Sequence, residues 1–92
     1  MIEIVYIGAA WCGTCKTIKP AIVELCKRYS VDVKLLDYDI DLEPEAQDEI
    51  KKVPTIRIFK DYRKVAEYNV NQVASTESWL ISNVKLAATD DF

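Results

Sequence analysis

The chain has 92 residues, a formal net charge of −3 and no histidine. We expect residues 1–92 to form a single domain, because this length supports one modest hydrophobic core. The small negative charge disfavours a nucleic acid partner, which calls for a basic face, and the lack of histidine excludes Cys–His nucleophilic catalysis and His-ligated zinc.

The cellular compartment can be predicted from apolar runs and cysteine content. No run approaches the roughly 20 apolar residues of a membrane-spanning helix, so no membrane association is expected. Residues 1–10 lack the basic start and the longer apolar stretch of a signal peptide. The chain has 3 cysteines, whereas a small secreted scaffold would use a larger, even set. These features predict a cytoplasmic protein, with a monomer as the default state for this size.

Residues 2–38 alternate between strand and helix patterns. Residues 2–7 form a near-continuous β-branched apolar run, typical of a strand buried on both faces. Residues 13–29 carry apolar side chains at the spacing of an amphipathic helix, and residues 31–38 return to a strand pattern. A strand, a helix and a strand in so short a stretch predict a βαβ unit with parallel strands.

The second half predicts a short helix, a hairpin and a final helix. Residues 44–50 suit a helix with proline at its first position. Residues 56–59 and 65–70 suit antiparallel strands around a polar turn, and residues 76–88 suit a helix capped by Ser75. The order βαβ-α-ββα predicts an α/β fold, a four-stranded mixed sheet with three helices distributed over its two faces.

The motif WCGTCK, residues 11–16, carries the chemistry of the sequence. It lies between the first predicted strand and helix, where open α/β sheets usually place their active sites. Cys12 would be the exposed nucleophile, because helix N-termini stabilise a thiolate and Lys16 adds positive charge to lower its pKa. Cys15 would lie within disulfide distance and would resolve the mixed disulfide that Cys12 forms with a client.

A metal site is an alternative reading of the two cysteines. Zinc or an iron–sulfur cluster wants four ligands, and Cys26 is the only other thiol. On a straight helix Cys26 would lie about 16 Å from Cys15, so such a site would need a dimer. Cys26 shares the apolar stripe of its helix and is interpreted as a small buried hydrophobe. A redox pair without metal is therefore expected.

Three motifs together resemble those of the thioredoxin superfamily. They are WCGTCK, then Pro20 five residues after the second cysteine, then Val53–Thr55 before a β-branched strand. The resemblance implies a thioredoxin-like sheet of order 2-1-3-4 and a cis peptide bond before Pro54. It also implies a client-binding surface around the cysteines, formed by Trp11, Gly13, Thr14, Val53 and Pro54.

The resemblance implies an enzyme that reduces protein disulfides through a reversible Cys12–Cys15 dithiol/disulfide pair. Such a protein binds no cofactor, and its electrons come from NADPH through a thioredoxin reductase, or from glutathione. Its partners are disulfide-containing client proteins. Two alternatives stay open, namely a glutaredoxin-like reductase coupled to glutathione and a client-binding module on the same fold without turnover.

Departures from the family pattern concern the second cysteine. The buried Asp that helps to deprotonate this cysteine in the family falls on Tyr6, and the Lys that pairs with this Asp falls on Leu35. The Asp and the Lys are replaced together, as expected, because one buried charge without its partner would be costly. Water, Asp39 or the client is then left to take the proton of Cys15. Thr14 replaces the usual proline, which predicts a more oxidising pair.

Overall fold

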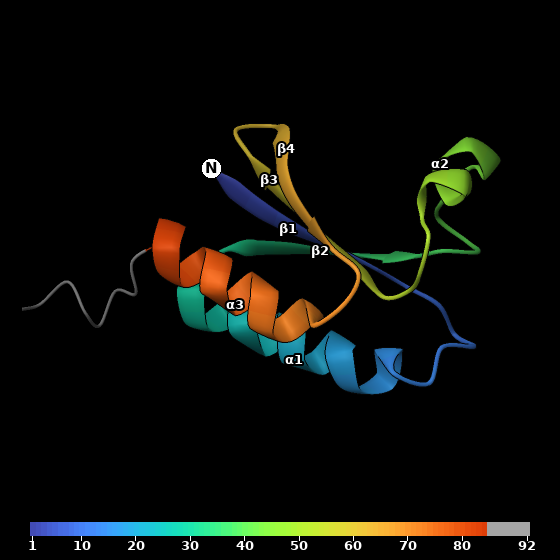
Figure 1. Cartoon of the computed structure of the whole chain (residues 1–92), viewed down its shortest axis with the longest axis horizontal. Helices are drawn as coiled ribbons and strands as arrows, with labels where there is room; N and C mark the ends of the chain where they lie inside the picture. The colour runs from blue at the N-terminus through green and yellow to red at the C-terminus, as the bar shows by residue number, and fades with distance from the viewer. Residues whose placement is uncertain (85–92) are drawn as a thin grey trace, which may run out of the picture.

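The computed structural model describes residues 1–84, so the end of the last predicted helix and the frayed tail predicted after it lie outside the described residues. Within that range the order βαβ-α-ββα is confirmed (Figure 1). The elements are β1 (Ile2–Gly8), α1 (Cys15–Tyr29), β2 (Asp32–Asp37), α2 (Pro44–Glu49), β3 (Thr55–Lys60), β4 (Arg63–Tyr68) and α3 (Gln72–Asn83).

The strands form one mixed sheet in the order β2-β1-β3-β4, which confirms the predicted topology. β1 pairs parallel with β2 and antiparallel with β3, and β3 pairs antiparallel with β4. The parallel register places Tyr6 directly opposite Leu35. The two positions at which the family's charged pair is replaced are therefore neighbours on adjacent strands.

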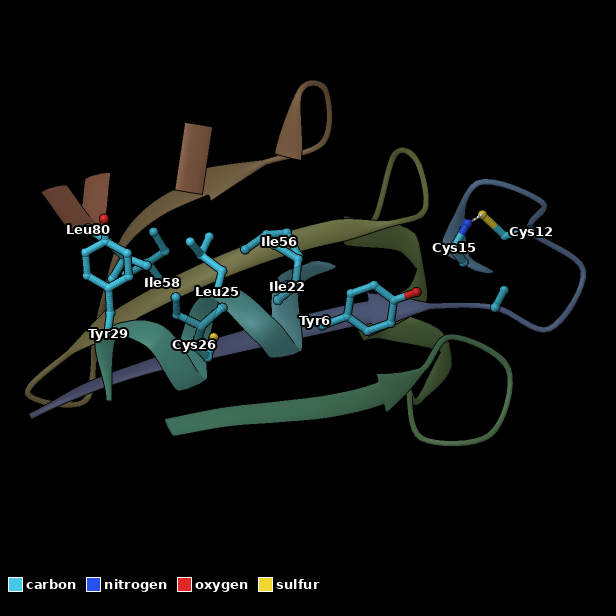
Figure 2. Close-up of a cluster of buried hydrophobic side chains, with 12 residues drawn as sticks. Tyr6, Cys12, Cys15, Ile22, Leu25, Cys26, Tyr29, Ile56, Ile58 and Leu80 are labelled. Atoms are coloured by element: carbon cyan, nitrogen blue, oxygen red, sulfur yellow. Dashed lines mark hydrogen bonds between the residues drawn. The ribbon is translucent and has the colours of Figure 1, made fainter. Parts of the chain in front are cut away.

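The main core lies between the sheet and the two long helices. α1 and α3 cover the same face of the sheet and pack against each other (Figure 1). Burying one large aliphatic side chain completely contributes about 1.5–3 kcal/mol, and this face holds more of the buried side chains than the other face does. Figure 2 shows the cluster, whose fully or almost fully buried members include Ile4, Ile22, Leu25, Cys26, Ile56, Ile58 and Leu80.

The opposite face of the sheet is covered less completely. Val5 and Ile7 pack there against Ile50, and Leu42 and Phe59 are partly buried beside them. The short helix α2 lies beyond one end of the sheet in Figure 1, so only the residues flanking it reach this face. The expectation of helices on both faces therefore holds only in part, because α1 and α3 share one face.

The start of α3 was predicted wrongly. The helix begins at Gln72 instead of residue 76, and it ends at Asn83, after which Val84 has extended backbone. The early start has a tertiary cause, because the Gln72 side chain is buried and donates hydrogen bonds to the carbonyl oxygens of Pro54 and Asn69.

No helix of the described residues is long and apolar enough to cross a membrane.

The hairpin between β3 and β4 is tighter than predicted. Its turn consists of Asp61 and Tyr62, both with positive φ (53° and 69°), as in the two-residue turns that match the twist of antiparallel strands. β4 therefore starts at Arg63 and ends at Tyr68, two residues earlier than the sequence pattern suggested.

Candidate active site

The two cysteines of the motif lie where the loop after β1 meets α1, with Cys12 in the loop and Cys15 in the helix. Cys15 is the first residue of α1 and Thr14 is its N-cap, so the helix begins two residues later than predicted. The backbone N–H of Cys12 donates to the carbonyl oxygen of Ala9 over 3.1 Å, which turns the loop back on itself. This turn brings the Cys12 side chain in front of the first turn of the helix.

The Cys12 sulfur is held by three neighbours. It accepts a hydrogen bond from the backbone N–H of Cys15 at 3.3 Å (Figure 2). It lies 3.4 Å from the Thr14 hydroxyl oxygen and 3.8 Å from the carbonyl oxygen of Val53, to which the thiol can donate. Cys12 is only 8% exposed, so the expectation of an exposed nucleophile is wrong. Its side chain packs against the helix and the Val53 loop.

The two thiols have pKa values shifted in opposite directions. Burial opposes ionisation of Cys12, but hydrogen bonds from Cys15 and Thr14 outweigh it and hold the pKa of Cys12 below its ordinary value. Burial raises the pKa of Cys15, and the contact with Cys12 raises it further, while a hydrogen bond from Tyr6 offsets only part of the rise. Cys12 is therefore the thiol that ionises first.

Lys16 lies one residue into α1 and is exposed. The groups that lower the pKa of Cys12 are Cys15 and Thr14, and the Lys16 ammonium is not among them. Lys16 instead lines a cavity beside Cys15. Its role in tuning the active site stays a prediction.

The Val53–Pro54 peptide bond is cis, as the resemblance implied. The Val53 carbonyl faces the Cys12 sulfur, and the Pro54 carbonyl accepts a hydrogen bond of 2.8 Å from the Gln72 side chain. Gln72 is 6% exposed and was missed by sequence reasoning, because the polarity of glutamine predicts a surface position. Only the fold shows that it ties this loop to the start of α3.

Trp11 stands on the surface beside the cysteines and is 66% exposed. Its indole N–H donates to the Asp39 carboxylate over 2.7 Å, and its ring packs edge-on against Tyr38 with centroids 6.3 Å apart. Trp11 and Val53 line the same surface hollow, whose other edge carries two lysines. Gly13 is also exposed at this surface, and nothing lies close to its Cα on the side where a side chain would project.

The third thiol is separate from the motif. Cys26 is 1% exposed within the main core, and burial raises its pKa to about 11. It occupies the position of a small buried hydrophobe, as expected from its helix stripe. Among residues 1–84 no group of three or more His, Cys, Asp or Glu side chains is arranged to hold a metal ion.

Comparison with known proteins matches most of the chain to thioredoxins and thioredoxin-like proteins. The family model described as Thioredoxin matches residues 2–85. Mouse thioredoxin is 40% identical over 70 residues, which cover 74% of this chain and 66% of the mouse protein. A thioredoxin-like protein of Synechocystis is 33% identical over 85 residues, which cover 90% of this chain and 70% of that protein. The chain thus spans 66–70% of the length of these two curated relatives.

A solved structure supports the same conclusion about the fold. The reduced thioredoxin pre-protein of Schistosoma mansoni is 32% identical and superposes with a TM-score of 0.77, covering 88% of this chain and 77% of that chain. Sequence and backbone therefore agree over the elements that carry the two cysteines.

Proposed function

Because the chain belongs to the thioredoxin family, we propose that it is a thiol–disulfide oxidoreductase that reduces disulfide bonds in client proteins. The carrying observation is the asymmetry of the two thiols. Cys12 accepts a hydrogen bond from the Cys15 backbone at the start of α1 and has a lowered pKa, while Cys15 has a raised one. This asymmetry defines an attacking thiol and a resolving thiol.

In the first step the Cys12 thiolate attacks one sulfur of a client disulfide. A bond forms between this sulfur and the Cys12 sulfur, the client S–S bond breaks, and the other client sulfur leaves as a thiolate that takes a proton from water. The N–H of Cys15 and the hydroxyl of Thr14 stabilise the Cys12 thiolate before attack.

In the second step Cys15 loses its proton and attacks the Cys12 sulfur. The Cys12–Cys15 disulfide forms, the mixed disulfide breaks, and the second client sulfur leaves as a thiolate. Two electrons have then passed from the dithiol to the client. A client would be positioned by the surface that Trp11, Gly13, Thr14 and Val53 form around the reacting sulfurs. The Pro54 side chain is fully buried, so it would act by holding the Val53 loop in place and not by touching the client as expected.

The remaining parts of the cycle come from partners. The oxidised pair would be reduced by an NADPH-dependent thioredoxin reductase, or alternatively by glutathione, and no bound cofactor is required. These donors suit a cytoplasmic monomer that acts on disulfide-containing proteins. The family membership supports a reductase donor over glutathione, because the motif WCGTCK is not the CPYC motif of glutaredoxins.

A redox titration tests this proposal directly. A Cys26→Ala chain, which keeps only the two motif thiols, is equilibrated in graded redox buffers and its free thiols are trapped by alkylation. We expect one two-electron transition, at a potential above the about −270 mV of thioredoxin because Thr14 replaces proline. Turnover of a disulfide-linked client with a dithiol donor then separates an enzyme from a binding module. Cysteines that never pair at any potential would overturn the proposal.

A further inference from the structure

We propose that the Tyr6 hydroxyl is the hydrogen-bond donor that stabilises the Cys15 thiolate when this thiol resolves the mixed disulfide. The inference rests on the proposed function and adds a catalytic residue to it. Tyr6 would act without giving up its own proton, so it replaces a buried base by a neutral donor.

The position of Tyr6 supports this role. Tyr6 lies in the middle of β1, is 3% exposed, and belongs to the same buried cluster as Cys12 and Cys15. Figure 2 shows its ring lying along the cluster with the hydroxyl directed toward the end that holds the cysteines. Tyr6 and Cys15 line the same cavity at this end of the cluster, and the Tyr6 hydroxyl acts to lower the pKa of Cys15. The polar side chain beside the second reacting cysteine is thus a phenol.

Gly8 leaves the space that the hydroxyl occupies. A Cβ atom at Gly8 would lie 2.2 Å from the Tyr6 hydroxyl oxygen and 2.6 Å from the ring carbon that carries it. Gly8 does not have positive φ, so its backbone conformation is one that any residue could adopt. The absence of a side chain at Gly8 therefore serves the placement of the Tyr6 hydroxyl.

The protonation state of Tyr6 decides between a base and a donor. Burial, the contact with Cys15 and the charge of Cys12 all raise the pKa of Tyr6 far above its ordinary value. A phenol that stays protonated cannot accept the Cys15 proton, but it can donate to the Cys15 thiolate. Such donation favours the ionised thiol, against the burial that disfavours it.

The Cys15 proton has a separate exit. A cavity of about 390 Å³ opens next to Tyr6 and Cys15. Its charged lining comes from α1 and from the end of β2 with the turn that follows: Lys16, Lys19, Asp37 and Asp41. Asp39, one of the proton acceptors considered from the sequence, is not part of this lining and binds the Trp11 indole instead. The Cys15 proton can therefore leave through this cavity to solvent or to the carboxylates of Asp37 and Asp41.

The test separates the two chemical steps in the Cys26→Ala background. A nitrobenzoate disulfide reagent releases one coloured thiolate when Cys12 attacks and a second when Cys15 resolves the mixed disulfide, so stopped-flow absorbance gives two phases. Tyr6→Phe keeps the ring and removes only the hydroxyl. Tyr29→Phe is the matched control, because Tyr29 is buried at the other end of the same cluster (Figure 2).

We expect Tyr6→Phe to slow the second phase about three- to tenfold near neutral pH and to leave the first phase within twofold of the parent. The loss is smaller than the full strength of a hydrogen bond to a charged group, because a more basic thiolate is also a better nucleophile. The pH profile of the second phase should move to higher pH, and where Cys15 is fully ionised in both chains the Tyr6→Phe rate should equal or exceed that of the parent, because its thiolate is more basic. A structural defect would not produce this recovery.

Gly8→Ala is a second variant, which retains the Tyr6 hydroxyl but displaces it from Cys15. It should slow the second phase, as Tyr6→Phe does. Tyr29→Phe should change neither phase. A second phase in Tyr6→Phe with the rate and pH profile of the parent overturns the role of Tyr6 and leaves the proposed function intact. The absence of any second phase in the parent overturns the proposed function itself.

Discussion

Cys12 and Cys15 are three residues apart, yet the structure gives them opposite surroundings. The Cys12 sulfur faces two donors, the Cys15 N–H and the Thr14 hydroxyl, and its pKa is lowered. Cys15 begins α1, and its pKa is raised, chiefly by burial. Both cysteines are buried in the same cluster, and the CxxC spacing alone is symmetric. The fold breaks the symmetry, because hydrogen bonds at the start of α1 outweigh burial for the Cys12 sulfur and not for that of Cys15.

Replacing each thiol in turn gives the largest expected effect. Cys12→Ser should abolish client reduction, because the attacking sulfur is gone. Cys15→Ser should still allow attack, so it should accumulate a client mixed disulfide that electrophoresis without reductant detects. Cys26→Ala is the control and should keep its activity. Equal capture of client by both serine variants would mean that the thiols are interchangeable, contrary to the structure.

The third thiol isolates the effect of burial. Cys26 has a pKa raised to about 11 by burial alone. A group whose folded pKa is raised stabilises the fold below its unfolded pKa and loses this contribution as pH rises through the folded value. The chain should therefore lose about 2–3 kcal/mol of unfolding free energy between roughly pH 9 and pH 11 relative to Cys26→Ala.

Denaturant unfolding of both chains across this pH range measures the difference in unfolding free energy. The titration of lysines and tyrosines is common to both chains and cancels in this difference. The two curves should diverge as pH rises. Parallel curves would show that Cys26 ionises as freely as a solvated thiol, and burial could then not explain the raised pKa of Cys15 either.

The loop on the Cys12 side depends on Gln72. Gln72→Ala removes the donor to the Pro54 and Asn69 carbonyls and should cost about 1–3 kcal/mol of unfolding free energy, since buried acceptors lose their partner. Asn83→Ala is the matched control, because Asn83 makes the same kind of amide–carbonyl bond to Trp79 at the surface. Its cost should stay within about 0.5 kcal/mol. Equal losses in both variants would show that burial of the Gln72 amide adds nothing.

The smallest expected effect on the difference between Cys12 and Cys15 comes from a substitution of Thr14. Thr14→Val removes the hydroxyl beside the Cys12 sulfur and keeps a similar shape. The pKa of Cys12 should rise by up to about one unit, which corresponds to one ordinary hydrogen bond. The pH dependence of Cys12 alkylation measures the shift. Thr17→Val, at an exposed position one turn on, is the control, and an identical profile in Thr14→Val would remove the hydroxyl from the account.

Much of the fold could be predicted because its signals are local. The β-branched run of β1, the helical spacing of α1 and the position of Pro44 each specify their own element. The resemblance added the strand order and the cis bond before Pro54, both of which the structure bears out. These features depend on a few residues close in sequence, or on motifs whose order is distinctive.

The remaining features depend on contacts between distant segments. Gln72 is polar and yet buried, because two carbonyls of another loop need its amide. Cys12 is covered by Val53, 41 residues away. In the sequence Tyr6 is only the residue that replaces an Asp, whereas in the fold its hydroxyl occupies the space that Gly8 leaves free. No periodicity encodes such pairings.

Site-resolved alkylation across pH is the most direct test of the asymmetry between the two thiols. The reduced Cys26→Ala chain is treated briefly with a thiol alkylating agent at each pH, and mass spectrometry of its peptides gives the modified fraction of each cysteine. The structure predicts that Cys12 reacts at a pH below that of an ordinary thiol and that Cys15 reacts only at higher pH. Reaction of Cys15 first, or of both cysteines together, would contradict the assignment of attacking and resolving thiols.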